Sequence, residues 1–521
     1  MNNFYQRTMN KQILWISLLT FLFACNQQEP TNLTKTALIP KPVSVTANGE
    51  AFIITKKTII YVQASDELSK VAQYFTDMLK PATGFSLSLK TNSPPPATGI
   101  WLGLTDDSQL GAEGYRLLVS KNLISLQANT PEGVFRGLQT IRQMLPHEIE
   151  ANTIQQVKWI IPGGEIIDYP EYAFRSSMLD VSRHFFPVED VKHYIDLLAA
   201  YKMNFFHIHL SDDQGWRIEI KSWPKLTEIG SKTQVGGGQG GFYTQEQYKD
   251  IVNYAAERYI TVVPEIDMPG HTNAALASYP ELNRDGKARE LYTGTEVGFS
   301  TLCTDKEITY KFVDDVIREL AALTPGDYIH IGGDESHATK KNDYIKFINK
   351  VQDIVISYDK VMIGWDEITH ADLSDLAVAQ YWSSAENAKR AVDKGVPLII
   401  SPAKKAYIDM KYDSLTTLGL KWAGYIEVQT GYDWDPVTLE KEISRENILG
   451  VEAPLWTENI ASRSDFQYMV MPRLPGYAEI AWTTTDSRNW DEYKVRLAEH
   501  GKRFEISGIN YYPSKQIPWS N

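Results

Sequence analysis

Apolar and polar residues follow two different patterns along the chain, and the first pattern covers roughly residues 37 to 156. This stretch has mixed periodicity. It predicts strands at 52–54 and 58–62, helices at 68–79 and 133–145, and a hairpin that pairs 115–119 with 123–126. These elements make a compact α+β unit. It holds no cluster of candidate catalytic groups, so we interpret it as a support domain.

The second pattern begins after residues 162–164, where short apolar runs alternate with helical patterns. Such alternation is typical of βα units on a parallel sheet. The eight strand candidates begin near Phe174, Asn204, Ile260, Tyr328, Val361, Ala377, Val396 and Ile448. Eight strands of this kind predict an α/β fold, a (β/α)8 TIM barrel, behind the small α+β domain. An open doubly wound sheet is the alternative, because strand order is invisible in the sequence.

The first residues have the pattern of an export signal. Arg7 and Lys11 precede an apolar run at 13–24, which is shorter than the roughly 20 residues of a spanning helix. Leu-Phe-Ala-Cys at 22–25 resembles the bacterial lipobox, in which the cysteine is lipidated and becomes the first residue. The resemblance implies lipidation at Cys25 and a bacterial lipoprotein anchored at the periplasmic or cell-surface face of the envelope. A plain secretory signal is the alternative.

These observations divide the chain into four parts. The predicted boundaries are a signal peptide at 1–24, a tether at 25–36, the α+β domain at 37–165 and the barrel domain at 166–521.

Composition adds limits on function. The net charge of −13 argues against a protein that follows nucleic-acid phosphates, which needs a basic face. The 13 Trp and 28 Tyr suit a site that stacks on sugar faces, although many could equally be core residues.

Polar clusters follow three of the predicted strands, at 207–217, 264–271 and 330–335, where a barrel places its chemistry. His207 and His209 share one strand face, so a metal-dependent hydrolase is one alternative. Asp334 and Glu335 are chain neighbours, poorly placed to grip a sugar from opposite faces as ordinary glycosidases do. They could divide the labour if the substrate brings its own nucleophile.

The stretch His330-Ile331-Gly332-Gly333-Asp334-Glu335 resembles the H-x-G-G-D-E motif of family 20 glycoside hydrolases, the β-N-acetylhexosaminidases. Further matches follow in family order, at Arg175 with 179–185, then at 212–216, 264–271, 364–367, 407–410 and 456–458. The preceding α+β unit also resembles the usual N-terminal domain of that family. The resemblance therefore covers most of the chain.

This resemblance implies an exo-acting, retaining glycosidase that releases terminal β-linked N-acetylglucosamine or N-acetylgalactosamine by substrate-assisted catalysis. The 2-acetamido oxygen would attack C1 and form an oxazolinium intermediate, so neither a metal nor an organic cofactor is expected. Glu335 would be the general acid and later the base. Asp334 would hold the acetamido N–H, and Tyr407 would donate to the acetamido oxygen.

The remaining implied roles concern support and binding. Asp212 and His271 would form a relay behind Glu335, and Asp409 would orient Tyr407. The implied sugar contacts are Arg175 and Glu458 for the hydroxyl groups, and Trp365, Trp382 and Trp456 as an apolar box. The expected partners are glycans that end in N-acetylhexosamine, with no nucleic acid, and the membrane only through the lipid anchor. A non-catalytic sugar-binding lipoprotein is the other alternative.

Overall fold

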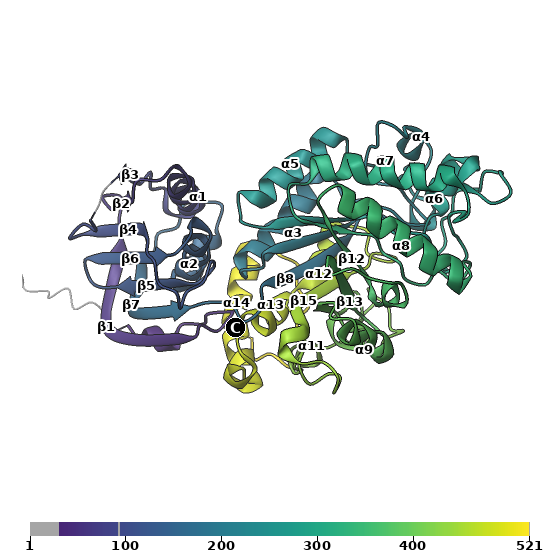
Figure 1. Ribbon diagram of the computed structural model, residues 1–521. Coiled ribbons are helices and arrows are strands. Elements are labelled where there is room, and N and C mark those ends of the chain that lie inside the picture. Colours follow the sequence, from purple (N-terminus) through teal and green to yellow (C-terminus); the bar gives the residue numbers. More distant parts are fainter. Residues whose placement is uncertain (1–30, 92–93, 520–521) are drawn as a thin grey trace, which may run out of the picture.

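The computed structural model describes residues 31–91 and 94–519, which form two domains joined side by side (Figure 1). The signal peptide at 1–24 and the lipidation site expected at Cys25 lie outside the described residues. Among the described residues, no helix combines the length and the apolar character needed to cross a membrane.

The N-terminal domain is a seven-stranded mixed sheet in the order β1-β7-β5-β6-β4-β2-β3. The strands are β1 Ser44–Ile54, β2 Ile59–Val62, β3 Ser88–Thr91, β4 Gly99–Leu104, β5 Tyr115–Val119, β6 Leu123–Ala128 and β7 Trp159–Asp168. Helices α1 (Asp66–Thr83) and α2 (Pro131–Met144) cover the face turned toward the second domain (Figure 1). Alternate residues of β6 are buried, as a sheet covered on one face requires. This confirms the predicted α+β unit.

The second domain is a closed parallel barrel in which β15 pairs with β8. Its strands are β8 Phe174–Asp180, β9 Phe205–His209, β10 Thr261–Glu265, β11 Tyr328–His330, β12 Val361–Trp365, β13 Ala377–Tyr381, β14 Leu398–Ile400 and β15 Ile448–Leu455. Each strand begins within two residues of its predicted start. The closure confirms the barrel and excludes the open sheet. Strand β7 belongs to the first sheet, so that sheet continues past residue 165.

Helices surround the barrel (Figure 1). The longer ones are α3 Val188–Ala200, α5 Gln245–Ala256, α7 Glu307–Leu323, α8 Lys341–Ser357, α9 Ala385–Asp393, α12 Arg463–Val470, α13 Leu474–Trp482 and α14 Trp490–Ile506. The short ones are α4 Lys225–Glu228, α6 Asn273–Ser278, α10 Ala403–Ala406 and α11 Val428–Tyr432. Between β12 and β13 only the 3-10 helix η5 (Asp366–His370) intervenes. The segment from the end of β12 to the start of β13 therefore has little regular structure.

A buried ion cluster joins the two domains. Arg175 is the second residue of β8, and its Nη1 lies 2.9 Å from Oε1 of Glu113 in the N-terminal domain. Arg136 of α2 donates to Oε2 of the same carboxylate at 3.0 Å, and both guanidinium groups are fully buried. Burial would raise the pKa of Glu113, but Arg175 and Arg136 together lower it to about 2.

This arrangement corrects the role expected for Arg175. The residue lies at the N-terminal end of β8, whereas the polar clusters follow the C-terminal ends of the strands. Its guanidinium also donates to the backbone oxygens of Lys202 and Tyr172. Arg175 therefore holds the domains together and does not reach a sugar.

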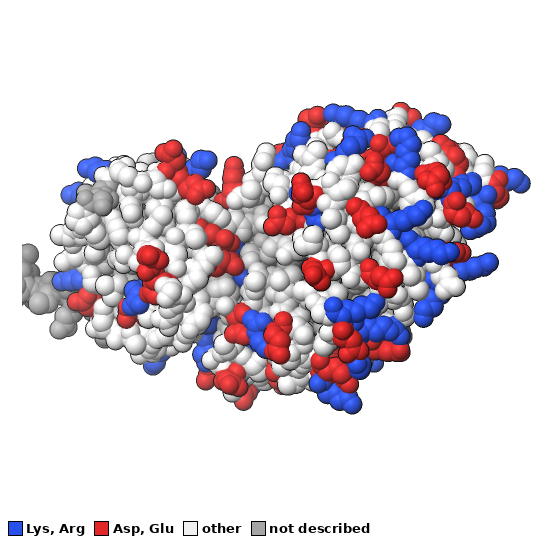
Figure 2. Space-filling model, in the orientation of Figure 1, with Lys and Arg blue, Asp and Glu red and all other residues white. Residues whose placement is uncertain are grey.

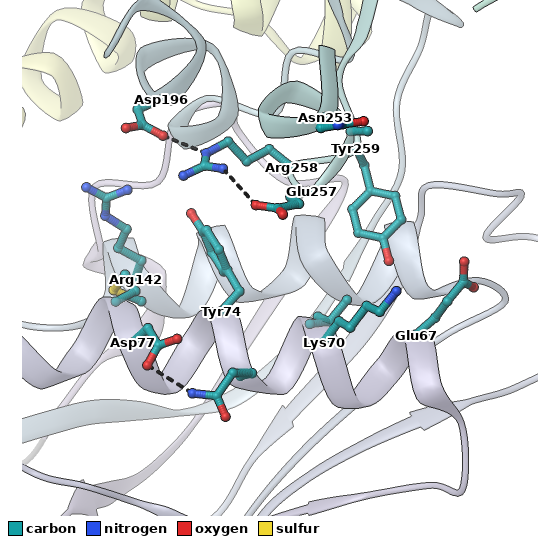
Figure 3. A pocket seen from close by; sticks show the side chains of 14 residues that line it. Glu67, Lys70, Tyr74, Asp77, Arg142, Asp196, Asn253, Glu257, Arg258 and Tyr259 are labelled. Atoms are coloured by element: carbon teal, nitrogen blue, oxygen red, sulfur yellow. Dashed lines mark hydrogen bonds and ion pairs between the residues drawn. The ribbon is translucent and has the colours of Figure 1, made fainter. Parts of the chain in front are cut away.

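A groove of about 970 Å³ lies between the domains, along α1 and the C-terminal end of α5 (Figure 3). On the barrel side of this groove, Arg258 contacts Asp196 at 2.6 Å and Glu257 at 3.9 Å (Figure 3). None of the candidate site residues lines it. On the face shown in Figure 2, basic and acidic side chains are interspersed over the barrel, without a continuous basic strip among the described residues.

We expect Glu113→Gln to destabilise the folded protein by about 3–5 kcal/mol, because it removes the carboxylate of buried Arg175 and leaves buried Arg136 with Glu132 alone. The measurement is urea unfolding of both proteins at neutral pH and at a series of pH values below 4.5. Since the folded pKa of Glu113 is about 2 and its ordinary value is 4.5, the carboxylate stabilises the fold fully above pH 4.5. The wild-type advantage should shrink as the pH falls from 4.5 toward 2.

The matched control is Glu492→Gln, which removes the carboxylate from an exposed pair with Lys41. It should cost less than about 1 kcal/mol. Equal effects of the two substitutions would show that the interface carboxylate has no special structural role.

Candidate active site

The polar and aromatic side chains that the sequence singles out meet at the C-terminal ends of the barrel strands. Asp334 and Glu335 follow β11, Asp212 follows β9 and His271 follows β10. Later strands contribute the residues Trp365, Trp382, Tyr407, Asp409, Trp456 and Glu458. Of the expected site residues that the structure describes, only Arg175 lies elsewhere.

The backbone after β11 has an unusual path. Gly332 and Gly333 have φ of +66° and +101°, and Glu335 itself has φ of +43°. A Cβ at Gly332 would stand 1.8 Å from Oδ1 of Asp267, the oxygen that accepts the Gly333 N–H at 3.0 Å. Only glycine permits this approach. The strained turn presents Asp334 and Glu335 together, and left-handed backbone of this kind clusters at functional sites.

His271 connects the two acidic residues to a buried carboxylate. Its Nδ1 lies 3.1 Å from Oδ1 of Asp212, while its Nε2 lies 3.7 Å from Asp334 and 3.6 Å from Glu335. His271 also has left-handed backbone, with φ of +54°. The expected relay of Asp212 and His271 thus lies next to Glu335, and its imidazole is at nearly the same distance from Asp334.

The charges in this relay are fixed by its surroundings. Burial would raise the pKa of Asp212, but Arg183, at 2.8 Å, and His271 hold it far below its ordinary value. Burial would lower the pKa of His271, but Asp212 and Asp267 raise it well above its ordinary value. The pair is therefore a carboxylate and an imidazolium at neutral pH.

Asp334 is electrostatically different from its relay. Burial and the carboxylate of Asp267 raise the pKa of Asp334 well above its ordinary value. Burial also raises the pKa of Asp267 to about 7. Oδ1 of Asp334 and Nε2 of His271 are buried without a hydrogen-bond partner among the described residues. Unsatisfied buried polar atoms at a strand end are typical of a site that awaits a polar ligand.

An aromatic cluster stands beside the acidic pair. Trp365, Tyr407 and Trp456 are buried together, and Trp382 packs against them. The Trp382 and Tyr407 rings are nearly parallel, at 14°, with centroids 6.3 Å apart. Trp422, 58% exposed, lies edge-on to both of these rings. Trp422 lies in the irregular segment between β14 and β15, which has no apolar periodicity that would mark it in the sequence.

Arg183 adds a second cation to this site; it lies within the motif at 179–185, to which the family resemblance gave no sugar-binding role. It donates to Asp212 and lies over the ring of Trp456, 4.8 Å from the centroid. Its Nη1 and Nε have no hydrogen-bond partner among the described residues. Its position after the end of β8, in contrast to that of Arg175 at the start, is the signal that could have found it.

Asp409 and Glu458 also lie at this end of the barrel. Neither carboxylate oxygen of Asp409 has a hydrogen-bond partner in the described chain, and none joins it to Tyr407. Burial and the charge of Glu458 raise the pKa of Asp409 well above its ordinary value. Burial and the charges of Asp334 and Asp409 raise the pKa of the Tyr407 hydroxyl well above its ordinary value, so Asp409 acts on Tyr407 through its charge.

His207 and His209, the candidate metal ligands in the sequence, contact carboxylates inside the barrel. His209 contacts Glu265 through Nδ1 and Asp212 through Nε2, and His207 contacts Glu452 at 2.9 Å. Burial would lower the pKa of His207, but Glu452 and Glu265 raise it to about 9. His207, Glu265 and His330 are close enough to hold an ion. However, a protonated His207 is a hydrogen-bond donor and a poor metal ligand.

Family models match nearly the whole described chain. The model "Glycosyl hydrolase family 20, catalytic domain" matches residues 172–485, and "Glycosyl hydrolase family 20, domain 2" matches residues 35–169. These matches correspond to the barrel and to the N-terminal sheet.

Relatives agree with the family models. A β-N-acetylhexosaminidase of Cellulomonas fimi is 40% identical over 487 residues, which cover 93% of this chain and 97% of the relative. The solved family 20 β-N-acetylhexosaminidase of Streptomyces coelicolor A3(2) has a TM-score of 0.91 and 50% identity, covering 94% of this chain and 100% of its own. The Streptomyces plicatus enzyme, solved with Thio-NAglucal, has a TM-score of 0.91 and 51% identity, covering 94% and 99%. The chain therefore belongs to glycosyl hydrolase family 20, and it has the β-N-acetylhexosaminidase activity and substrate-assisted mechanism of that family.

Proposed function

We propose that this hexosaminidase removes single terminal N-acetylhexosamine residues from the non-reducing ends of glycans, with Glu335 and Asp334 as its catalytic pair. The observation that carries the proposal is the meeting of Asp334, Glu335 and the imidazolium of His271 beside the aromatic cluster. Adjacent carboxylates suit a reaction in which one serves the leaving group and the other serves a nucleophile on the substrate.

Glu335 performs the proton transfers. As general acid it protonates the glycosidic oxygen while the bond from C1 breaks, and as base it later takes a proton from the attacking water. The ionised Asp212 keeps His271 protonated, 3.6 Å from the Glu335 carboxyl. This imidazolium stabilises the Glu335 carboxylate that forms when the proton leaves.

Asp334 and Tyr407 position the substrate's own nucleophile. The 2-acetamido oxygen attacks C1 as the leaving group departs, so the acetamide nitrogen gains positive charge. The Asp334 carboxylate accepts the N–H and opposes that charge, while the Tyr407 hydroxyl donates to the acetamido oxygen. Trp365, Trp382 and Trp456 surround the methyl group and the sugar face.

Recognition of a chain end falls to three polar side chains. Arg183 takes the place first expected for Arg175, and Asp409 and Glu458 stand with it at the same end of the barrel. The unpartnered atoms of Arg183 and Asp409, together with the Glu458 carboxylate, would pair with the hydroxyl groups of a terminal sugar. We also propose export and lipid anchoring through Cys25, supported by the lipobox-like stretch at 22–25.

The test of this function uses two aryl β-glycosides, one with a 2-acetamido group and one with a 2-hydroxyl group, with and without a chelator. We expect hydrolysis of the acetamido sugar alone, indifferent to the chelator. Glu335→Gln should lower kcat for a poor leaving group by about 10²–10⁴-fold, because the general acid is lost. The measured quantities are kcat and KM for each substrate.

The control is Glu446→Gln, an exposed carboxylate in η6 (Arg445–Asn447), which should leave both constants unchanged. Equal hydrolysis of both sugars would mean that the protein supplies the nucleophile. Loss of activity with the chelator would instead favour the metal-dependent alternative.

The pH profile tests the role of Asp334, which must be ionised to accept the N–H. Because its pKa is raised, kcat/KM should fall on the acid side well above the ordinary Asp value of 3.8. Asp267→Asn removes a neighbouring negative charge, lowers the pKa of Asp334 and should move this acid limb downward. Asp353→Asn, on exposed α8 surface, is the control. An unmoved limb in Asp267→Asn would remove Asp334 from this titration.

Cell fractionation tests the anchor. Cys25→Ala should shift the protein from the membrane fraction to the soluble fraction, because it removes the lipidated thiol. Cys303→Ala removes the buried thiol of the barrel and should leave the protein at the membrane. Membrane association that survives Cys25→Ala would disprove anchoring through this residue.

A further inference from the structure

The Gly-Trp-Asp-Glu stretch at 364–367 contains two carboxylates that the proposed mechanism does not use. Asp366 and Glu367 open η5, directly after β12. Both residues therefore lie next to the C-terminal end of β12, which is the barrel end that carries the site. Their hydrogen bonds lead to one side chain of the aromatic cluster, Trp382.

Asp366 fixes the backbone that carries Trp382. Its Oδ2 accepts the N–H groups of Trp382, Ser383 and Ser384 at 3.1, 3.1 and 3.2 Å. Its Oδ1 accepts from the side-chain amide of Asn387 at 2.6 Å. Asp366 is fully buried, so these four donors are the partners that this carboxylate requires. The segment from β13 to α9 is therefore held in one conformation.

Glu367 fixes the ring of the same residue. The indole Nε1–H of Trp382 donates to Oε2 of Glu367 at 3.0 Å. An indole has a single donor, and the ring torsion of Trp is otherwise broad. One hydrogen bond at Nε1 therefore selects one ring plane. Burial and the carboxylates of Asp366 and Asp334 raise the pKa of Glu367 well above its ordinary value, which places it near the catalytic pair.

The selected plane is the one parallel to Tyr407. The two rings are inclined by 14°, with centroids 6.3 Å apart. Carbon atoms in contact stand roughly 3.5–4.0 Å apart, so a methyl group between two rings would need roughly 7–8 Å. The rings are closer than that, so the Trp382 indole forms a near wall of the space beside the Tyr407 hydroxyl. Trp382 is only partly buried, and its outer side faces Trp422 in an irregular segment. Without the bond to Glu367, the ring would be free to turn and widen this space.

We propose that Asp366 and Glu367 are positioning residues that set the acyl-group specificity of the enzyme, by holding the Trp382 indole as a fixed wall against the 2-acyl methyl group. This inference rests on the proposed placement of the 2-acetamido group beside Tyr407. The site then accepts the acetyl group and rejects longer acyl groups because its wall cannot retreat. Neither residue touches the reacting atoms.

The experiment compares aryl β-glycosides that carry 2-acetamido and 2-propionamido groups. One methylene in a rigid apolar space changes kcat/KM by about 10–200-fold, so the wild type should prefer the acetamido sugar within that range. Glu367→Leu should reduce this preference at least about fivefold. Glu367→Gln keeps an oxygen acceptor for the indole and should retain the preference.

Two further variants separate positioning from general damage. In a Trp382→Phe background, which lacks the Nε1–H donor, adding Glu367→Leu should change the preference no further. Glu386→Gln, an exposed α9 carboxylate 76% accessible and paired with Arg390, should leave the preference and the rates unchanged.

The outcomes are distinct. An unchanged preference in Glu367→Leu, an effect of Glu367→Leu that persists in the Trp382→Phe background, or a wild type without acyl preference would each overturn the proposal. Failure of the wild type to require a 2-acylamino group at all would instead overturn the proposed function. A Glu367→Leu protein that does not fold leaves Trp382→Phe to decide, since it must itself lower the preference.

Discussion

The site depends on a buried alternation of carboxylates and imidazoles that runs through the barrel. Its members, in contact order, are Glu452, His207, Glu265, His209, Asp212 and His271. A buried charge is tolerated only beside a partner of opposite sign, so each member fixes the protonation of the next. The last imidazolium stands beside the carboxyl groups of Asp334 and Glu335, the proposed catalytic pair. Under that proposal, the buried ion pairs give electrostatic support to proton transfer.

The same interior network holds the aromatic part of the site. Glu265 accepts the indole N–H of Trp365 at 3.0 Å, as Glu367 accepts that of Trp382. Arg183 lies over Trp456 while it neutralises Asp212. Apolar rings in this enzyme are thus oriented by carboxylates and a cation beneath or beside them. The aromatic side chains proposed to bind the acetyl group are therefore held in place by the same residues that carry the buried charges.

The N-terminal domain contributes differently. Its Glu113 pairs with Arg175 and Arg136 at the strand starts, the end of the barrel opposite to the catalysis. This contact fixes the position of β8 without entering the site. The groove between the domains, lined by pairs such as Arg258 with Asp196, belongs to this junction. The described structure thus supports the interpretation of this unit as a scaffold.

The sequence by itself determined the barrel and the acidic pair. Short apolar runs located every barrel strand, because the strands of a parallel barrel are buried on both faces, and the H-x-G-G-D-E stretch singled out Asp334 and Glu335. Tertiary structure alone decided between Arg175 and Arg183, since which strand end an arginine occupies follows from chain direction in a closed sheet. It also revealed how Glu367 reaches Trp382. Such contacts join residues from different loops, and no local pattern encodes the distance between loops.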